Sequence, residues 1–328
     1  MASQYTVLPF IETTLSEKKW NDFVENANGG TIFHRLDFLA YHKDRFLQNE
    51  RHLIILKGEE LCGLMPMAIF EESAQKIAKS PYGASYGGPI FPKKLTYSES
   101  GDVLDALLET IKRLGIRKLT ITFPISPVYA VYCDTFRLCM YERGFVASNR
   151  DISSVVTLGG TREQTEKSFE SRGRNMARKA EKLGIKIVPR ADLELFWPVL
   201  ARTYQKHAIP PTHSKDELCL LTKTFPDRIF FDVAVHENKS IAGIGYFVIN
   251  ARVNSSFYLA NDPDCQQLQG VSLLVSEALG RASEEGFKYF DFGTSSVAMH
   301  GRDNLFRFKE SFGAGGCFRD TFVWEAEA

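Results

Sequence analysis

The chain has 328 residues, more than one hydrophobic core usually accommodates, so two domains are expected. Apolar residues make up 44% of the sequence and charged residues 24%, which excludes a disordered or membrane-embedded chain. The 40 basic side chains balance 40 acidic ones, which counts against a dedicated nucleic-acid binder because such proteins usually carry a positive charge.

The cysteines and the N-terminal segment indicate where the protein works. The 6 cysteines form no CxxC pair and no Cys/His cluster with zinc-ligand spacing, so we expect reduced thiols and no bound metal. The first 20 residues lack a signal pattern, and no window approaches the roughly 18 uncharged apolar residues of a membrane span. The sequence therefore predicts a cytoplasmic protein without a membrane span.

Two stretches of the chain, residues 53–63 and 233–243, align with each other without a gap. Each contains an apolar strand, a short turn with Gly or Asn, and a second strand that reaches a glycine, the pattern of a β-hairpin. In both halves an amphipathic helix and an alternating strand follow, the strands at 118–123 and 288–292. A true duplication explains this match better than the general similarity of short α/β modules.

The boundary between the halves is expected near residues 150–160. Gly159 and Gly160 precede Thr161-Arg162-Glu163-Gln164, which has the pattern of a capping box that opens a helix. We therefore predict an N-terminal domain over residues 1–155 and a C-terminal domain over residues 156–328.

A basic helix is predicted over residues 172–183, with Leu183 on its apolar side. Another face carries Arg174, Arg178 and Lys182 at a spacing of four residues. Such a face is usually only solvated, but guanidinium groups also match phosphate oxygens. Arg174 and Arg178 are therefore candidates for binding a phosphate-bearing substrate.

Side chains at four further positions are candidates for an acceptor site. His207 and His213 flank a rigid proline-containing loop, although a loop histidine more often faces solvent. Tyr86 lies in the glycine-rich segment 81–89, which fits a pocket or a plain connection equally well. Tyr258 lies in the predicted strand 256–260.

The segment 267–272 leads from that strand into a helix. A glycine-bearing loop before a helix presents free backbone N–H groups, which suit a pyrophosphate. The candidate donor-binding residues in this segment are Gln267, Gln269, Gly270, Val271 and Ser272.

A short helix is predicted from Asp303, a good N-cap residue, to Gly313. Leu305, Phe308 and Phe312 form its apolar stripe, with Lys309 on the flank of that stripe. A lysine beside apolar walls can stabilise the oxyanion of an acyl-transfer intermediate. The alternative is a lysine whose methylene groups merely cover core surface.

Asp291 shares one face of the strand 288–292 with Tyr289. A carboxylate near the carboxyl end of such a strand either forms structural hydrogen bonds or points into a ligand cleft. If burial raised its pKa, it would act as the general base for an incoming amine. Both roles remain open for Asp291.

Five strings resemble the FemAB family, also called the BioF2-like acetyltransferases, and the resemblance extends over nearly the whole chain. They are residues 31–39 (TIFHRLDFL), 86–89 (YGGP), 174–180 (RNMARKA), 286–293 (GFKYFDFG) and 308–313 (FKESFG). The resemblance implies an α/β (α+β) fold of two tandem GNAT-like acyl-CoA N-acyltransferase domains, with mixed, mostly antiparallel sheets flanked by helices.

The resemblance also implies a reaction class and site residues. Family members carry a functional Phe-Lys pair that Phe308 and Lys309 match, and segment 267–272 resembles the GNAT pyrophosphate loop, with Ser272 in its last small position. The implied activity moves an acyl group from acyl-CoA or a carrier to an amine of a cell-envelope or sugar/peptide precursor, without a tightly bound cofactor.

Two alternatives remain at the level of the sequence. The first is an aminoacyl-tRNA as the donor, for peptidoglycan bridge formation, which the neutral charge disfavours. The second is a catalytically silent binding protein that kept the fold. Neither the identity of donor and acceptor nor the oligomeric state follows from the sequence.

Overall fold

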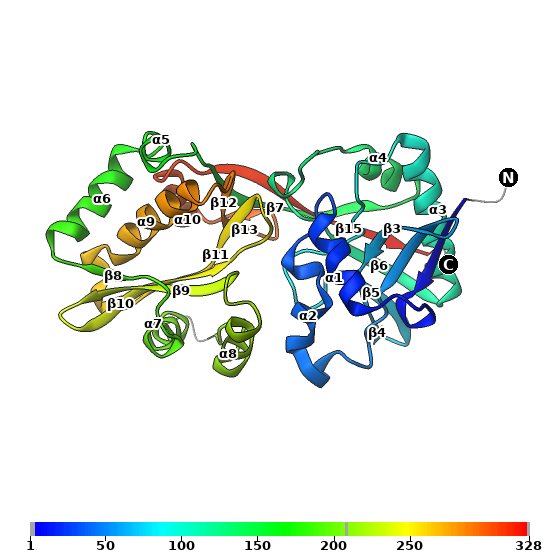
Figure 1. Cartoon of the computed structure of the whole chain (residues 1–328), viewed down its shortest axis with the longest axis horizontal. Coiled ribbons are helices and arrows are strands. Elements are labelled where there is room, and N and C mark those ends of the chain that lie inside the picture. The colour runs from blue at the N-terminus through cyan, green and yellow to red at the C-terminus, as the bar shows by residue number, and fades with distance from the viewer. Residues whose placement is uncertain (1–3, 207–208, 327–328) are drawn as a thin grey trace. The chain divides into compact units, whose positions relative to one another are not determined.

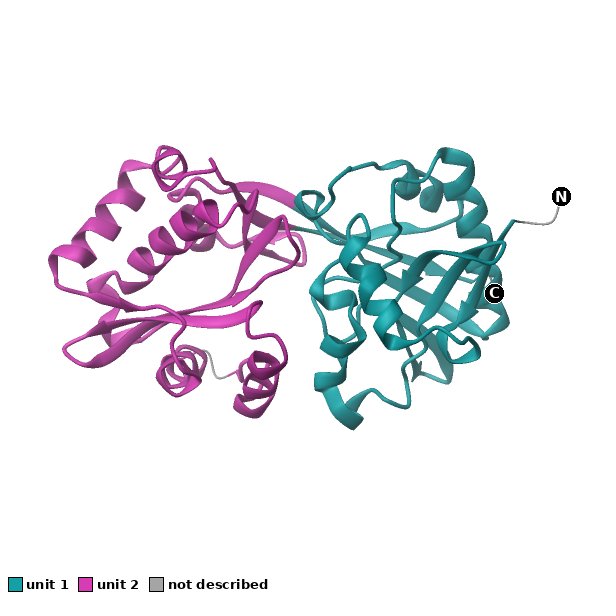
Figure 2. Ribbon diagram, in the orientation of Figure 1, with its two compact units in different colours: residues 1–151, 318–328 teal, residues 152–317 magenta. Residues whose placement is uncertain are grey.

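The computed structural model describes residues 4–206 and 209–326, so the predicted His207 lies outside the described residues. The chain folds into two compact units: residues 1–151 with 318–328, and residues 152–317 (Figure 2). Among the described residues, no helix has both the length and the apolar character that crossing a membrane requires.

The C-terminal strand β15 (Gly315–Glu325) corrects the predicted division of the chain. Its residues from Phe318 onward belong to the first unit, not to the C-terminal domain, and the second unit begins at Ile152. The strand pairs with β6 (Ile116–Thr122), and its Phe322 and Trp324 are buried in the first unit's core. Burial of these two aromatic rings fixes the strand there, an effect that no local pattern reveals.

The first unit contains a three-stranded antiparallel sheet and further strands around β6 (Figure 1). The small sheet has the order β1 (Tyr5–Pro9), β2 (Leu53–Lys57), β3 (Glu60–Met65), and the other strands follow the order β4 (Ala68–Glu72), β5 (Gln75–Ser80), β6, β15. Its helices are α1 (Glu17–Asn26), α2 (Leu36–Leu39), α3 (Tyr97–Arg113) and α4 (Thr135–Glu142), with 3-10 turns η1 (Phe10–Glu12), η2 (Ile32–His34), η3 (Ala40–Arg45) and η4 (Ser126–Val128).

The second unit is built on the strand order β7 (Val146–Thr157), β12 (Tyr289–Thr294), β11 (Val253–Asn261), β10 (Lys239–Phe247), β9 (Ile229–His236), β8 (Lys186–Val188). Helices α6 (Ser171–Lys182), α9 (Gly270–Glu284) and α10 (Asp303–Glu310) cover one face, and α7 (Leu193–Gln205) and α8 (Lys215–Thr224) cover the other (Figure 1). The remaining elements are α5 (Arg162–Glu166), η5 (Pro263–Leu268), β13 (Ser296–Val297) and β14 (His300–Gly301).

The two predicted hairpins are confirmed. β2 and β3 are joined by a two-residue turn at residues 58–59, and β9 and β10 by one at residues 237–238. Gly58 and Asn238 adopt left-handed φ values of 61° and 63°, which glycine and asparagine tolerate best. The helices α3 and α9 and the strands β6 and β12 also lie where the sequence predicts them.

Candidate active site in the second unit

Strands β11 and β12 run parallel but pair over only three residue pairs. The last of these joins Ser255 to Asp291, after which β11 continues to Asn261 and β12 to Thr294. Beyond this point β11 keeps its antiparallel partner β10 on its other edge. Within the described residues, the edge of β11 from Ser256 onward is therefore not paired with β12.

The hydrogen bonds of β12 explain why the pairing stops. The Gly293 N–H donates to Asp291 Oδ1 at 2.8 Å, and Gly293 adopts a φ of 71°, which favours glycine. The Ser153 hydroxyl donates to the same oxygen at 2.6 Å. Asp291 thus binds the backbone of its own strand end, and the strand bends there.

Lys309 donates hydrogen bonds to the backbone carbonyl groups of the same bend in β12. Its Nζ donates to the Gly293 and Thr294 carbonyl oxygens, each at 2.9 Å. Because backbone groups bound to Asp291 and Lys309 are not free for β11, these two side chains hold the end of β12 out of the ladder. The sequence indicated Asp291 and Lys309 only as separate candidate residues, whereas the structure joins them through one strand end.

Burial changes the ionisation of Lys309. Its side chain is only 4% exposed, and this loss of solvent lowers its pKa to about 8, against an opposing effect of the Asp291 carboxylate. The predicted helix stripe is wrong in one respect: Leu305 is 45% exposed, and Lys309 occupies the buried side with Phe312. Asp303 is the first helical residue and not the N-cap, which is Arg302.

Phe308 neighbours Lys309 on α10 and packs against the hydrophobic core of the second unit. Its ring lies 5.4 Å from that of Phe312, centroid to centroid, in an edge-to-face arrangement. Phe308 therefore anchors the helix that presents Lys309.

β11 carries an irregularity next to its unpaired edge. Its register with β10 shifts between the pairs Gly245–Tyr258 and Tyr246–Ser256, which leaves Phe257 as an additional residue. Such β-bulges re-aim backbone groups and are frequent beside active sites. The unpaired edge of β11 is therefore locally bent at residues 256–258.

The predicted acceptor residues His213 and Tyr258 lie in contact. The imidazole Nδ1 is 2.7 Å from the Tyr258 hydroxyl, and that hydroxyl also accepts the His213 N–H at 3.1 Å. Both side chains are buried, with the rings of Phe247 and Phe257 beside the imidazole. His213 is thus a buried partner of a residue on β11 and not a solvent-facing loop histidine.

The predicted donor loop forms the N-terminus of α9. Gln269 is the N-cap in a left-handed conformation with a φ of 62°, and its side chain makes no capping hydrogen bond. A Cβ atom on Gly270 would lie 3.1 Å from Ala242 Cβ, so a glycine allows the helix start to approach β10.

The other polar side chains of this segment bond locally. Gln267 and Gln269 donate their side-chain amides to the carbonyls of Asp264 and Gln266, and the Ser272 hydroxyl donates to Gln269 Oε1 at 3.2 Å. Val271 is partly buried in the first turn. The backbone of the first turn of α9, rather than these side chains, is the group suited to an anion.

The remaining predicted residues lie elsewhere in the fold. Arg174 on α6 donates to the Phe169 carbonyl, and Arg178 is exposed on the same helix. Leu183 does not belong to the buried side as predicted, since it is 41% exposed just after the helix ends. Tyr86 lies in the first unit, where the Arg319 guanidinium sits 5.3 Å from the centre of its ring.

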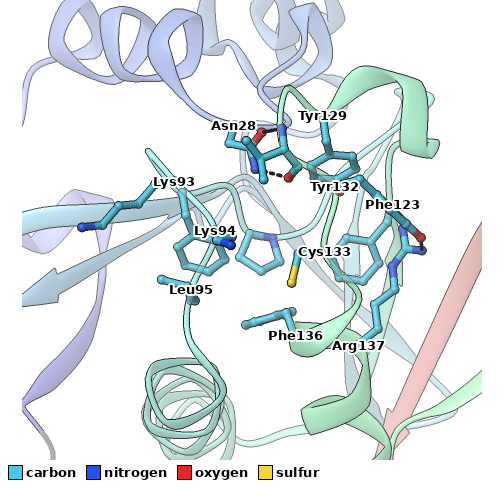
Figure 3. A pocket seen from close by; sticks show the side chains of 13 residues that line it. Asn28, Lys93, Lys94, Leu95, Phe123, Tyr129, Tyr132, Cys133, Phe136 and Arg137 are labelled. Carbon is cyan, nitrogen blue, oxygen red and sulfur yellow. Dashed lines mark hydrogen bonds between the residues drawn. The ribbon is translucent and has the colours of Figure 1, made fainter.

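The first unit contains a small pocket that the sequence did not predict, with a volume of about 60 Å³ (Figure 3). It lies between α4 and the segment before α3, and aromatic, cationic and thiol side chains line it, among them Phe91, Lys94, Tyr129, Cys133 and Phe136. The backbone N–H and side-chain hydroxyl of Thr135 lower the pKa of the Cys133 thiol. No local pattern marks this pocket, because its walls come from distant segments.

Residues 167–309 match the family model described as an acetyltransferase (GNAT) domain. Comparison with curated protein sequences gave no significant match.

Several solved structures share the fold over nearly the whole chain. The FemX crystal structure is 12% identical, has a TM-score of 0.72, and the match covers 96% of this chain and 97% of that one. L-PGS from Bacillus licheniformis is 10% identical with a TM-score of 0.56, over 89% and 91%. A tandem GNAT protein from the clavulanic acid biosynthesis pathway is 11% identical with a TM-score of 0.55, over 99% and 98%.

These findings confirm the predicted fold class and the predicted resemblance. The chain has the tandem GNAT fold of the FemX structure, and residues 167–309 of its second unit match a GNAT acetyltransferase domain.

Proposed function

We propose that the protein transfers an acyl group from an acyl-CoA, or from a carrier such as acyl-ACP, to an amine of a cell-envelope or sugar/peptide precursor. The observation that carries this proposal is the unpaired edge of β11, which lies beside the N-terminus of α9. That helix start has no side-chain capping hydrogen bond. An extended amide-bearing arm can form strand-like hydrogen bonds with such an edge. A pyrophosphate can bind the N–H groups of the first turn of the helix.

The reaction requires a stabilised oxyanion. The amine nitrogen attacks the thioester carbonyl, the new C–N bond forms, and the C–S bond then breaks. Protonation of the leaving thiolate balances the proton that the nitrogen loses. Lys309 has three N–H donors, of which two bind the Gly293 and Thr294 carbonyls, so its charge and its third donor suit the developing oxyanion.

The other predicted residues take supporting roles in this proposal. Asp291 already accepts two hydrogen bonds and fixes the bend of β12, which favours a positioning role over that of a general base. Phe308 anchors α10. His213 and Tyr258 are proposed to contact the acceptor, because they form a buried polar pair behind the bent part of β11.

A second candidate donor, an aminoacyl-tRNA, is favoured by the surface of α6. This helix carries five cations, and among the described residues none of them forms an ion pair: Arg172, Arg174, Arg178, Lys179 and Lys182. Such a face would displace the counterions condensed on a nucleic acid, so binding would have a steep salt dependence.

One experiment separates the two donors. Calorimetric titration with acetyl-CoA is expected to show saturable binding that changes little with salt, and product formation is expected from acyl-CoA and an envelope-type amine. Steeply salt-dependent binding of charged tRNA, with no response to acetyl-CoA, would replace the leading proposal by its alternative. A protein that binds both donor types without forming product from either would be a silent relative.

A further inference from the structure

The hydroxyl group of Ser256 is unusual among the buried serines of the second unit. Ser256 is 3% exposed, yet its Oγ has no hydrogen-bond partner among the residues that the structure describes. By contrast, Ser153 donates to Asp291 at 2.6 Å, and Ser154 and Ser295 lie 2.6 Å apart, hydroxyl to hydroxyl. Because a buried unpaired hydroxyl is costly, native proteins rarely retain one without a use.

Ser256 lies where the pairing between β11 and β12 ends. Ser255 is the last residue of β11 that pairs with β12, so Ser256 is the first residue of the unpaired edge. It also lies at the register shift toward β10, directly before the additional residue Phe257. Ser256 therefore stands where β11 departs from the regular sheet.

The strand opposite Ser256 is the one that Lys309 holds. Asp291 pairs with Ser255, and the next backbone groups along β12 are bound by Asp291 and Lys309 rather than by β11. A group that occupies the beginning of the unpaired edge is therefore bordered by Ser256 on one strand and by the lysine-bound end of the other. This is where the proposed reaction places the thioester carbonyl.

We infer that Ser256 is a specificity-determining residue that donates a hydrogen bond to the carbonyl oxygen of the transferred acyl group. The inference rests on the proposed function, which it refines to the level of one contact. A hydroxyl can donate to a carbonyl oxygen, and a donor bound along β11 would supply the missing partner. Free CoA, which lacks the acyl group, would leave the hydroxyl unpaired.

The test compares Ser256→Ala with the control Ser283→Ala in the full-length protein. Ser283 is also buried, but it accepts from Thr165 Oγ1 at 2.9 Å and donates to the Thr161 carbonyl at 3.1 Å. Melting temperature without ligand, and calorimetric titration with acetyl-CoA and with CoA, are measured for the wild type and both variants. Ser256→Cys serves as a second variant with a weak donor.

The expected results differ between the two serines. Ser256→Ala keeps or raises the melting temperature and weakens acetyl-CoA binding about tenfold, with less than about a twofold change for CoA. Ser256→Cys binds acetyl-CoA about as weakly as the alanine variant. Ser283→Ala lowers the melting temperature and leaves both affinities unchanged.

Several outcomes would overturn the inference. A melting temperature lowered in Ser256→Ala as much as in Ser283→Ala would show that the hydroxyl is already bonded in the free protein. Unchanged acetyl-CoA affinity, or an equal loss for acetyl-CoA and CoA, would rule out contact with the acyl carbonyl while the proposed function stands. A wild-type protein that binds neither ligand would overturn the proposed function and this inference together.

Discussion

The helices α3 and α9 occupy corresponding places in the two units, but their N-termini differ. In α3 the Thr96 hydroxyl accepts the Glu99 N–H, and the Glu99 carboxylate accepts the Thr96 N–H, so the helix caps itself. In α9 the N-cap Gln269 makes no side-chain capping bond. The first unit closes its helix start with side chains, whereas in α9 the Gln269 and Ser272 N–H groups donate to the backbone carbonyls of Gln266 and Gln269, at 3.2 and 3.0 Å.

The parallel strand pair of the first unit is also longer than that of the second unit. β5 and β6 pair over five residue pairs, whereas β11 and β12 pair over three before Asp291 and Lys309 bind the end of β12. The Glu99 carboxylate in the first unit also bonds Lys57 at 3.0 Å, and its pKa falls to about 2, chiefly because the Thr96 N–H donates to it. The first unit thus has the longer parallel pairing and the side-chain-capped helix. In the second unit part of β11 is unpaired with β12, and the helix has no side-chain cap.

Replacing Lys309, which binds the end of β12, is expected to have the largest effect on activity. We expect Lys309→Met to lower kcat/KM by about 10²–10³, because the positive charge and the donor facing the oxyanion are lost. Thermal stability is expected to change little, because removal of the buried charge offsets the loss of the hydrogen bonds to the Gly293 and Thr294 carbonyls. Arg307→Gln, on the exposed side of the same helix, is the control, and an active Lys309→Met enzyme would contradict the catalytic role.

The pH dependence of the reaction gives a second test of Lys309. Because its pKa is lowered to about 8, kcat/KM is expected to fall about tenfold per pH unit above that value as the ammonium loses its proton. Lys309→Arg should lack this limb, because a guanidinium stays charged. A limb that persists in an active arginine variant would assign the titration to another group.

The same ionisation makes a prediction for stability. The folded pKa lies below the ordinary lysine value of 10.5, so the unfolded chain binds more protons between about pH 8 and 10.5. The free energy of unfolding contributed by Lys309 should therefore rise with pH across this window, and below pH 8 the cost of the buried charge is fully present. Denaturant titration of wild type and Lys309→Met at pH 7.5 and 10 measures the difference.

A side chain at Gly270 tests whether the N-terminus of α9 binds the donor. Gly270→Val is expected to weaken acetyl-CoA binding about tenfold and to destabilise the second unit by about 1–3 kcal/mol, because the new atoms meet Ala242 and Ile241. Calorimetric titration and thermal melting measure both effects. A variant with wild-type affinity would show that the start of α9 does not bind the donor.

A change at the capped N-terminus of α3 should have the smallest effect on donor binding. Thr96→Ala removes the capping hydroxyl of α3 and is expected to cost about 1 kcal/mol of unfolding free energy. Acetyl-CoA affinity should not change, because the donor site is proposed in the second unit. A clear loss of affinity in Thr96→Ala would indicate that the comparison between the two helix ends is wrong.

The sequence by itself determined the local elements and the family fold. The hairpins with turns at 58–59 and 237–238 and the helices α3 and α9 follow from periodicity and turn residues, which act over a few neighbouring positions. The resemblance selected Phe308 and Lys309. These signals are short-range, or depend on residue identity, so they are readable along the chain.

Only the tertiary structure decided which groups meet. The C-terminal strand lies in the first unit because Phe322 and Trp324 find their core there. Lys309 binds the end of β12, His213 contacts Tyr258, and Ser256 stands at the opening of β11 through contacts between distant segments. Those contacts depend on packing across the whole unit, which periodicity and spacing do not encode.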